Sequence, residues 1–194
     1  MDKVMTPEFR VSFAHVFEPH AFSEGDTAKY SVVMLFDENE NLDAMKKLAA
    51  ATVKEKWPKG KPANLRNPFR KGSEKPNLDG YEGTIFVTAS SKMQPGVVDK
   101  EVQPIIDTNE FYSGCYARAT VTCYAYGGPG TKFTPGVAFG LQNVQKLRDG
   151  DTFSGRSKAE DDFDVFDTGD DATEFSNDAT ESQVKQETED DMFA

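Results

Sequence analysis

The alternation of apolar and polar positions predicts a chain built mainly from β-strands. From Phe9 to Phe17 the odd-numbered residues are expected to share one face, with the period of two that is typical of a half-buried strand. This strand is expected to end at Glu18-Pro19. Residues 29–36 are almost entirely apolar, which indicates a central strand. Further strands are expected at residues 84–90, 97–106, 114–126 and 137–147.

One helix is expected between the second and third of these strands. Asn41 is a suitable N-cap, and Pro58 is expected to end the helix after Trp57. A long loop at 60–80 and a turn at 127–130 complete the pattern. About six strands and one helix favour a small β-barrel or an α+β sandwich. The buried face of the helix is predicted to consist of Leu42, Met45, Leu48, Ala49, Thr52 and Val53.

The strand expected at 114–126 has two faces of different chemistry. One face is small and apolar and is predicted to pack inward: Cys115, Ala117, Ala119, Val121, Cys123 and Ala125. The other face carries Tyr116, Arg118, Thr120, Thr122, Tyr124 and Tyr126. Single-strand binders use flat rings for bases and cations for phosphates, so we interpret the three tyrosines and Arg118 as candidate nucleic-acid contacts. The alternative is that the rings pack beneath a loop or helix.

A second candidate contact is the basic segment Lys54–Lys75. It holds eight basic residues against two acidic ones, with Trp57 and Phe69 interleaved. Basic and aromatic side chains on a loop suit contacts with phosphates and bases, although Trp57 suits an anchoring role equally well. The candidate contacts of this segment are Lys56, Trp57, Lys59, Lys61, Arg66, Phe69, Arg70 and Lys71.

The net negative charge of the chain lies entirely in its C-terminal part. Residues 1–158 carry 21 Lys and Arg against 19 Asp and Glu, a net charge of +2. Residues 159–194 carry Lys185 alone against 14 acidic residues, a net charge of −13. The apolar residues of this part follow no period, so it cannot bury enough surface to offset the entropy of ordering. We therefore expect a folded domain at 1–158 and a disordered acidic tail at 159–194.

The tail ends in three acidic residues followed by a methionine and a phenylalanine. Such a peptide suits a pocket with a basic rim, because the aromatic ring buries apolar area in the pocket and the carboxylates steer the peptide toward the basic rim. A solubilising tail without a partner explains the same sequence equally well. The residues predicted to contact a protein partner are Glu189, Asp190, Asp191, Met192 and Phe193.

The sequence offers no recognisable catalytic or metal site. Residues 127–130 lack the Lys-Ser/Thr pair and helix that a phosphate-binding loop needs. Cys115 and Cys123 are separated by about 26 Å on one strand, too far for a disulfide. Together with His15 and His20 they match no zinc spacing. We expect no enzyme, cofactor or metal. No apolar run of about 18 residues occurs and the N-terminus is polar, which predicts a cytoplasmic protein without membrane contact.

Three segments carry a family resemblance: FYSGCYARATVTCYAY (Phe111–Tyr126), GVAFGLQNVQKLRDGD (Gly136–Asp151) and AEDDF (Ala159–Phe163). They resemble the phage-encoded single-stranded-DNA-binding proteins. The resemblance implies an OB-fold core that binds single-stranded DNA without strong sequence preference. It also implies an acidic tail that contacts replication or recombination proteins. The implied binding strand is the one that bears Tyr116, Arg118, Tyr124 and Tyr126.

The charge split and the family resemblance together lead to further expectations. If the chain is phage-encoded, it acts in the host cytoplasm. The tail is expected to compete with DNA for the basic surface. The sequence leaves the oligomeric state open, a homodimer included. The rival hypothesis is an acidic DNA mimic or scaffold that binds and inhibits a nucleic-acid-processing enzyme, in which case the core binds no single strands. The expected helix follows the second strand, whereas an OB-fold usually carries its helix after the third.

Overall fold

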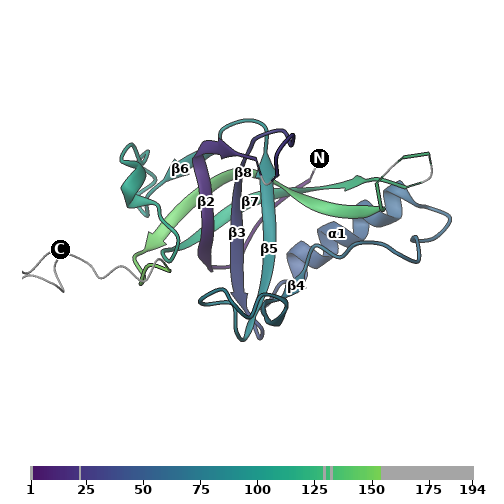
Figure 1. Ribbon diagram of the computed structural model, residues 1–194, viewed down its shortest axis with the longest axis horizontal. Helices are drawn as coiled ribbons and strands as arrows, with labels where there is room; N and C mark the ends of the chain where they lie inside the picture. The colour runs from purple at the N-terminus through teal and green to yellow at the C-terminus, as the bar shows by residue number, and fades with distance from the viewer. Residues whose placement is uncertain (1, 22, 129, 132, 154–194) are drawn as a thin grey trace, which may run out of the picture. The chain divides into compact units, whose positions relative to one another are not determined.

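The computed structural model describes residues 2–21, 23–128, 130–131 and 133–153 (Figure 1). The chain divides into two units, Met1–Arg156 and Ser157–Ala194, and the described residues belong to the first. Their elements are β1 (Lys3–Met5), β2 (Phe9–His20), β3 (Lys29–Asp37), α1 (Asp43–Lys56), β4 (Arg70–Lys71), η1 (Gly72–Glu74), β5 (Thr84–Ser91), β6 (Gly96–Val98), η2 (Thr108–Glu110), β7 (Tyr116–Tyr126) and β8 (Gly136–Arg148).

Five of the strands form a closed barrel in the order β2-β3-β5-β8-β7, with β7 pairing back to β2. All neighbouring pairs are antiparallel except β5 and β8, which are parallel. In chain order this connectivity is 1-2-3-5-4, which closes a Greek-key barrel of the OB type. The short strands β1, β4 and β6 lie outside this five-stranded ring and pair with β7, β5 and β8, respectively. The expected mainly-β, OB-fold-like core is confirmed.

The helix α1 packs on the inner side of the β7–β8 hairpin (Figure 1). Met45 and Ala49 are buried there with Cys123 and Val137 in the core. The N-cap of α1 is Leu42, without a side-chain cap, and not the expected Asn41. The Asn41 side chain lies one residue earlier and accepts a hydrogen bond from the backbone N–H of Asp43 at 2.9 Å. The helix lies between the second and third barrel strands, as the sequence predicted. Among the described residues, no helix has the length and apolar character needed to cross a membrane.

A β-bulge interrupts β2 and corrects the predicted alternation. Ser12 pairs with Val33 but His15 pairs with Ser31, so β2 contains one extra residue at this point. Phe13 adopts a positive φ of 48° within the bulge and is 46% exposed, whereas Val16 is fully buried. The bulge therefore turns Phe13 outward, and the strand continues through Pro19 to His20 instead of ending at Glu18-Pro19.

Other differences lie in the connections. The strand expected at 97–106 is limited to β6, because the chain turns at Asp99 and Pro104 makes only an isolated bridge with Val98. The expected loop at 60–80 contains β4 and η1, which cover part of the barrel's outer surface. There Val33 and Leu35 of β3 pack with Tyr81 and Phe86 in a second, smaller apolar cluster.

Candidate nucleic-acid interface

The outward side chains of β7 form the first candidate surface, which we call the tyrosine face: Tyr116, Arg118, Thr120, Thr122, Tyr124 and Tyr126. The predicted alternation is confirmed, because Cys115, Ala117, Ala119, Val121 and Cys123 are all buried. Arg118 is exposed, and the three tyrosines are half-buried. Both faces of the strand thus have the expected orientation.

Tyr116 lies at the start of the tyrosine face, between two arginines. The guanidinium carbon of Arg148 lies 3.4 Å from the centroid of its ring, and that of Arg10 lies 6.0 Å away. Arg148 also forms an ion pair of 2.7 Å with Glu8. The ring of Tyr116 is therefore already engaged with a cation, an arrangement that places positive charge at this end of β7.

At the other end of β7, Tyr126 lies over a glycine of the neighbouring strand. Tyr126 pairs with Gly136, and a Cβ at Gly136 would lie 2.5 Å from the Tyr126 hydroxyl oxygen. Tyr124 similarly lies near Gly140, 3.9 Å from the position of its missing Cβ. Glycines on β8 let these rings lie against the backbone of the sheet, with their outer surfaces turned away from it.

The loop residue Arg66 joins this end of the tyrosine face. It forms a parallel bridge with Gly136, and its N–H donates to the carbonyl of Pro135 at 2.9 Å. Paired residues of adjacent strands point to the same side of a sheet. Arg66 therefore points to the same side as Tyr126, with Gly136 between them. Two residues predicted as separate contacts, 60 positions apart, are brought together by β8.

Arg118 is held by a side-chain network in the middle of the tyrosine face. Its Nε donates to Oε1 of Gln145 at 2.7 Å, and Nε2 of Gln145 donates to the carbonyl of Asp99 at 3.0 Å. The guanidinium is thus oriented while its other donors remain at an exposed position.

The other candidates of the basic segment are spread over several surfaces. Lys56 ends α1 and lines a hollow beside Tyr124, whereas Trp57 packs against the core. Lys59 and Lys61 are exposed. Phe69 stands edge-on to the buried Phe139, with 5.6 Å between the ring centroids, which favours an anchoring role for Phe69 over stacking on a base. The remaining pair, Arg70 and Lys71, forms β4 on the opposite side of the barrel from β7.

Arg70 borders a second candidate surface that the sequence did not indicate. Figure 1 shows β2, β3 and β5 side by side, in front of β7 and β8. A groove of about 410 Å³ lies on their outer face. We call it the bulge groove, and its lining residues are Phe13, His15, His20, Val33, Arg70, Lys75, Leu78, Tyr81, Phe86 and Thr88.

Both aromatic rings and cationic side chains line the bulge groove. The rings of His15 and His20 are stacked, with centroids 4.4 Å apart. Arg70 lies over the ring of Phe86 at 5.1 Å and forms an ion pair of 2.5 Å with Glu74. Burial, and to a smaller extent the neighbouring His20, lowers the pKa of His15 below 6.5. The bulge groove is therefore lined by two stacked imidazole rings and by the cationic side chains of Arg70 and Lys75.

Sequence reasoning missed Phe13 and His15 as site residues because the bulge is not visible as a pattern. It included Lys75 only as one of the eight basic residues of the segment 54–75. Once the barrel connectivity is known, however, the fold itself indicates which face binds oligonucleotides. OB-folds bind oligonucleotides on the face of their second and third strands, which here are β3 and β5. The predicted tail contacts, 189–193, lie outside the described residues.

Comparison with known proteins agrees with the fold and with this ligand class. The chain is 31% identical over 166 residues to the protein p50 of Acyrthosiphon pisum secondary endosymbiont phage 1, covering 79% of this chain and 87% of that protein. The single-stranded-DNA-binding protein of bacteriophage Enc34, solved in complex with single-stranded DNA, superposes with a TM-score of 0.65. It is 22% identical and the match covers 78% of this chain and 89% of the Enc34 chain.

A second solved structure has the same fold. The single-stranded-DNA-binding protein gp2.5 of bacteriophage T7 superposes with a TM-score of 0.56 at 14% identity, over 83% of this chain and 92% of gp2.5. The family model described as the single-stranded-DNA-binding protein of Enterobacter phage Enc34 matches residues 2–175, almost the whole chain. This is a family of binding proteins and not of enzymes. The chain belongs to the Enc34 family of phage single-stranded-DNA-binding proteins.

Proposed function

We propose that the chain binds single-stranded DNA without strong sequence preference, in the cytoplasm of a phage-infected cell. Membership of the family supports single-stranded DNA as the ligand. The observation that carries the proposal is the bulge of β2, which turns Phe13 and His15 outward beside Arg70 and Lys75. Bulges commonly re-aim side chains at functional sites. In single-strand binders, aromatic side chains stack on the bases and neighbouring cations contact the phosphates.

The tyrosine face is a second proposed contact surface for the strand. Tyr124 and Tyr126 offer half-buried rings, with Arg66 beside Tyr126 and Lys56 beside Tyr124. Arg118 and Arg148 supply further positive charge along β7. We propose that the bulge groove binds the bases most tightly and that the tyrosine face extends the path of a longer strand.

The test is fluorescence anisotropy of a labelled single-stranded oligonucleotide with matched variants. Phe13→Ala is expected to weaken binding by about 1–3 kcal/mol, the contribution of one stacked base. Ile106→Ala is the control, because Ile106 is 90% exposed and lies outside both surfaces. Tyr126→Ala is expected to weaken the binding of long oligonucleotides more than that of short ones, whereas Tyr126→Phe keeps the ring and the affinity.

Two outcomes would contradict the proposal in different ways. Unchanged affinity of both Phe13→Ala and Tyr126→Ala would show that neither surface holds DNA. Failure of the intact chain to bind single strands even at low salt would favour the acidic DNA mimic or scaffold instead. In that case the chain should inhibit a nucleic-acid-processing enzyme when added to its assay.

We also propose that residues 159–194 form a tail separate from a domain at 1–158, and that residues 189–193 contact replication or recombination proteins. The charge split supports a tail that competes with DNA for the basic groups of the domain. Deleting residues 159–194 is expected to raise DNA affinity most at low salt, where screening is weakest. Equal affinities of the intact and shortened chains at low salt would count against competition.

A further inference from the structure

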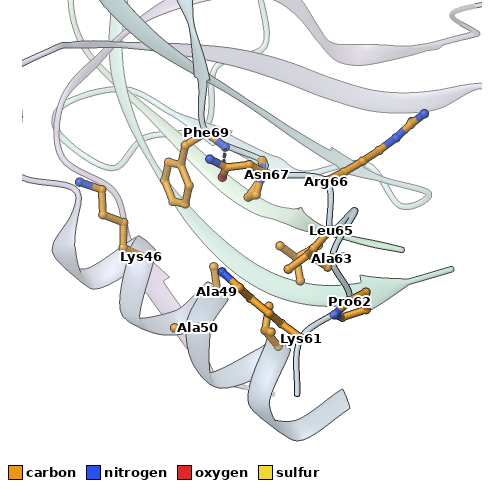
Figure 2. A pocket seen from close by; sticks show the side chains of 13 residues that line it. Lys46, Ala49, Ala50, Lys61, Pro62, Ala63, Leu65, Arg66, Asn67 and Phe69 are labelled. Atoms are coloured by element: carbon orange, nitrogen blue, oxygen red, sulfur yellow. Dashed lines mark hydrogen bonds between the residues drawn. The ribbon is translucent and has the colours of Figure 1, made fainter. Parts of the chain in front are cut away.

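A cleft of about 440 Å³ lies between α1 and the loop that follows it (Figure 2). Its volume lies within the range of about 300–1,000 Å³ that is typical of small-ligand pockets. One wall is the helix and the other is the loop segment 61–69. The residues that line this helix cleft are Lys46, Ala49, Ala50, Val53, Lys61, Pro62, Ala63, Leu65, Arg66, Asn67, Pro68, Phe69 and Val137.

The helix cleft has an apolar interior and a positively charged lining. Alanines 49, 50 and 63 leave space on both walls, with Leu65 and Val137 beside them. Among the residues that the structure describes, its lining includes three basic side chains and no Asp or Glu. Figure 2 shows Lys61 lying along the helix beside Ala49, whereas Arg66 points away from the cleft. The cleft therefore suits a ligand with an apolar, compact part and a negative charge.

Asn67 adds a polar group at the rim of the helix cleft. Its side-chain oxygen accepts a hydrogen bond from the backbone N–H of Phe69 at 3.1 Å (Figure 2). This bond orients the amide, whose nitrogen is a donor of the kind that pairs with acceptors on base edges.

The loop segment 66–70 links the helix cleft to both proposed DNA surfaces. Arg66 points to the side of the tyrosine face, Asn67 and Phe69 line the cleft, and Arg70 lines the bulge groove. Consecutive Cα atoms are only 3.8 Å apart. A strand whose phosphate reaches Arg70 therefore has a neighbouring nucleotide within reach of the cleft.

We infer that the helix cleft takes up a nucleobase of the bound strand, with Lys46 and Lys61 pairing the adjacent phosphates. The inference rests on the proposed binding of single-stranded DNA and adds a third binding element to it. A nucleotide satisfies the cleft's chemistry because its base is flat and largely apolar while its phosphate is anionic. Continuity with the two DNA surfaces favours this occupant over a peptide.

Substitutions on α1 test the inference in the intact chain. Ala50 is exposed and lines the cleft, and Ala51, which follows it, is exposed without lining it. Ala50→Phe fills the cleft and is expected to weaken binding of a single-stranded oligonucleotide about tenfold, within the range for one lost stacked base. Ala51→Phe introduces the same residue one position away and is expected to leave affinity unchanged. Lys46→Gln and Lys47→Gln form a second matched pair, with weaker binding expected only for Lys46→Gln.

Methyl NMR of the alanines separates failure of this inference from failure of the proposed function. On addition of an oligo-dT, the methyl resonances of Ala50 and Ala63 are expected to shift and that of Ala51 to stay. If the oligonucleotide binds by anisotropy but these methyls do not move and Ala50→Phe binds normally, the inference is wrong and the proposed function stands. If the methyls respond to a synthetic peptide of residues 186–194 and not to DNA, the cleft is a peptide site and the inference is also wrong. Absence of any oligonucleotide binding would overturn both.

Discussion

The ring of Tyr126 occupies the space in which a side chain of Gly136 would lie, since a Cβ at Gly136 would be 2.5 Å from the Tyr126 hydroxyl oxygen. Gly136→Ala must therefore displace the ring. We expect this substitution to destabilise the protein by about 1–3 kcal/mol, the usual cost of overpacking. Urea denaturation followed by circular dichroism measures the change.

A double-mutant cycle identifies the clash as the cause. Tyr126→Ala removes the ring, so Gly136→Ala should cost much less in that background than in the native chain. Equal costs in the two backgrounds would mean that the strain at Gly136 comes from the backbone and not from Tyr126.

Phe153 packs the segment that follows β8 against the barrel. Its ring packs against the second apolar cluster, the guanidinium carbon of Arg10 lies 4.2 Å from its centroid, and Arg10 donates to the carbonyl of Asp151 at 2.8 Å. Phe153→Ala is expected to lower the free energy of unfolding by about 2 kcal/mol. Phe133→Ala is the control and should change it by less than about 0.5 kcal/mol, since Phe133 is 73% exposed.

His15 makes stability depend on pH in a predictable direction. Its pKa is lowered below 6.5 in the folded protein by burial and by the adjacent His20. The unfolded chain therefore binds a proton at His15 at higher pH than the folded chain, and stability falls as pH is lowered through 6.5. We expect the drop in Tm between pH 7.5 and 5.5, two conditions chosen about one unit either side of the ordinary histidine pKa, to be smaller for His15→Gln.

Comparing the native protein with His15→Gln isolates the contribution of His15 to the pH dependence of Tm, because the carboxylates contribute to both Tm profiles alike. An NMR titration of the imidazole resonances checks the cause directly. An identical pH dependence of Tm in His15→Gln would show that the lowered pKa of His15 does not affect stability.

The two thiols should be inert in the native protein. Cys115 and Cys123 are free and buried, and burial raises the pKa of both. Because the thiolate is the reactive form, a disulfide reagent such as DTNB should react slowly until the protein is unfolded. Cys123, which lines the hollow beside Tyr124, should react before Cys115. Rapid reaction of Cys115 in the native protein would contradict its burial.

Much of the barrel could be predicted from the sequence, because half-buried strands alternate and α1 has a recognisable buried face. The faces of β7 followed directly from its period of two. The bulge in β2 could not be predicted in this way, since Phe13 and Val16 are both apolar and either is compatible with burial. Only the pairing with β3 determines that Phe13 turns outward.

The candidate site was predictable only in part, for a related reason. Local patterns indicated that Tyr126 and Arg66 had suitable chemistry, but their proximity depends on a bridge between Arg66 and Gly136, 70 positions apart. Long-range pairing of this kind leaves no periodic signal. The same holds for the bulge groove, where Arg70 meets Phe13 only after the barrel has formed.

Closure of the barrel between β5 and β8 also bears on the order in which the protein can be assembled. Only two pairs hold this parallel contact within the described residues, Ala89 with Phe139 and Ser90 with Gly140, and each spans 50 positions of the chain. Contacts so distant in sequence form late, because a long loop must close first. The described residues that line the bulge groove lie between Phe13 and Thr88. During synthesis on the ribosome, the strands that bear the groove can pair first, and the barrel that supports them is completed only when β8 emerges.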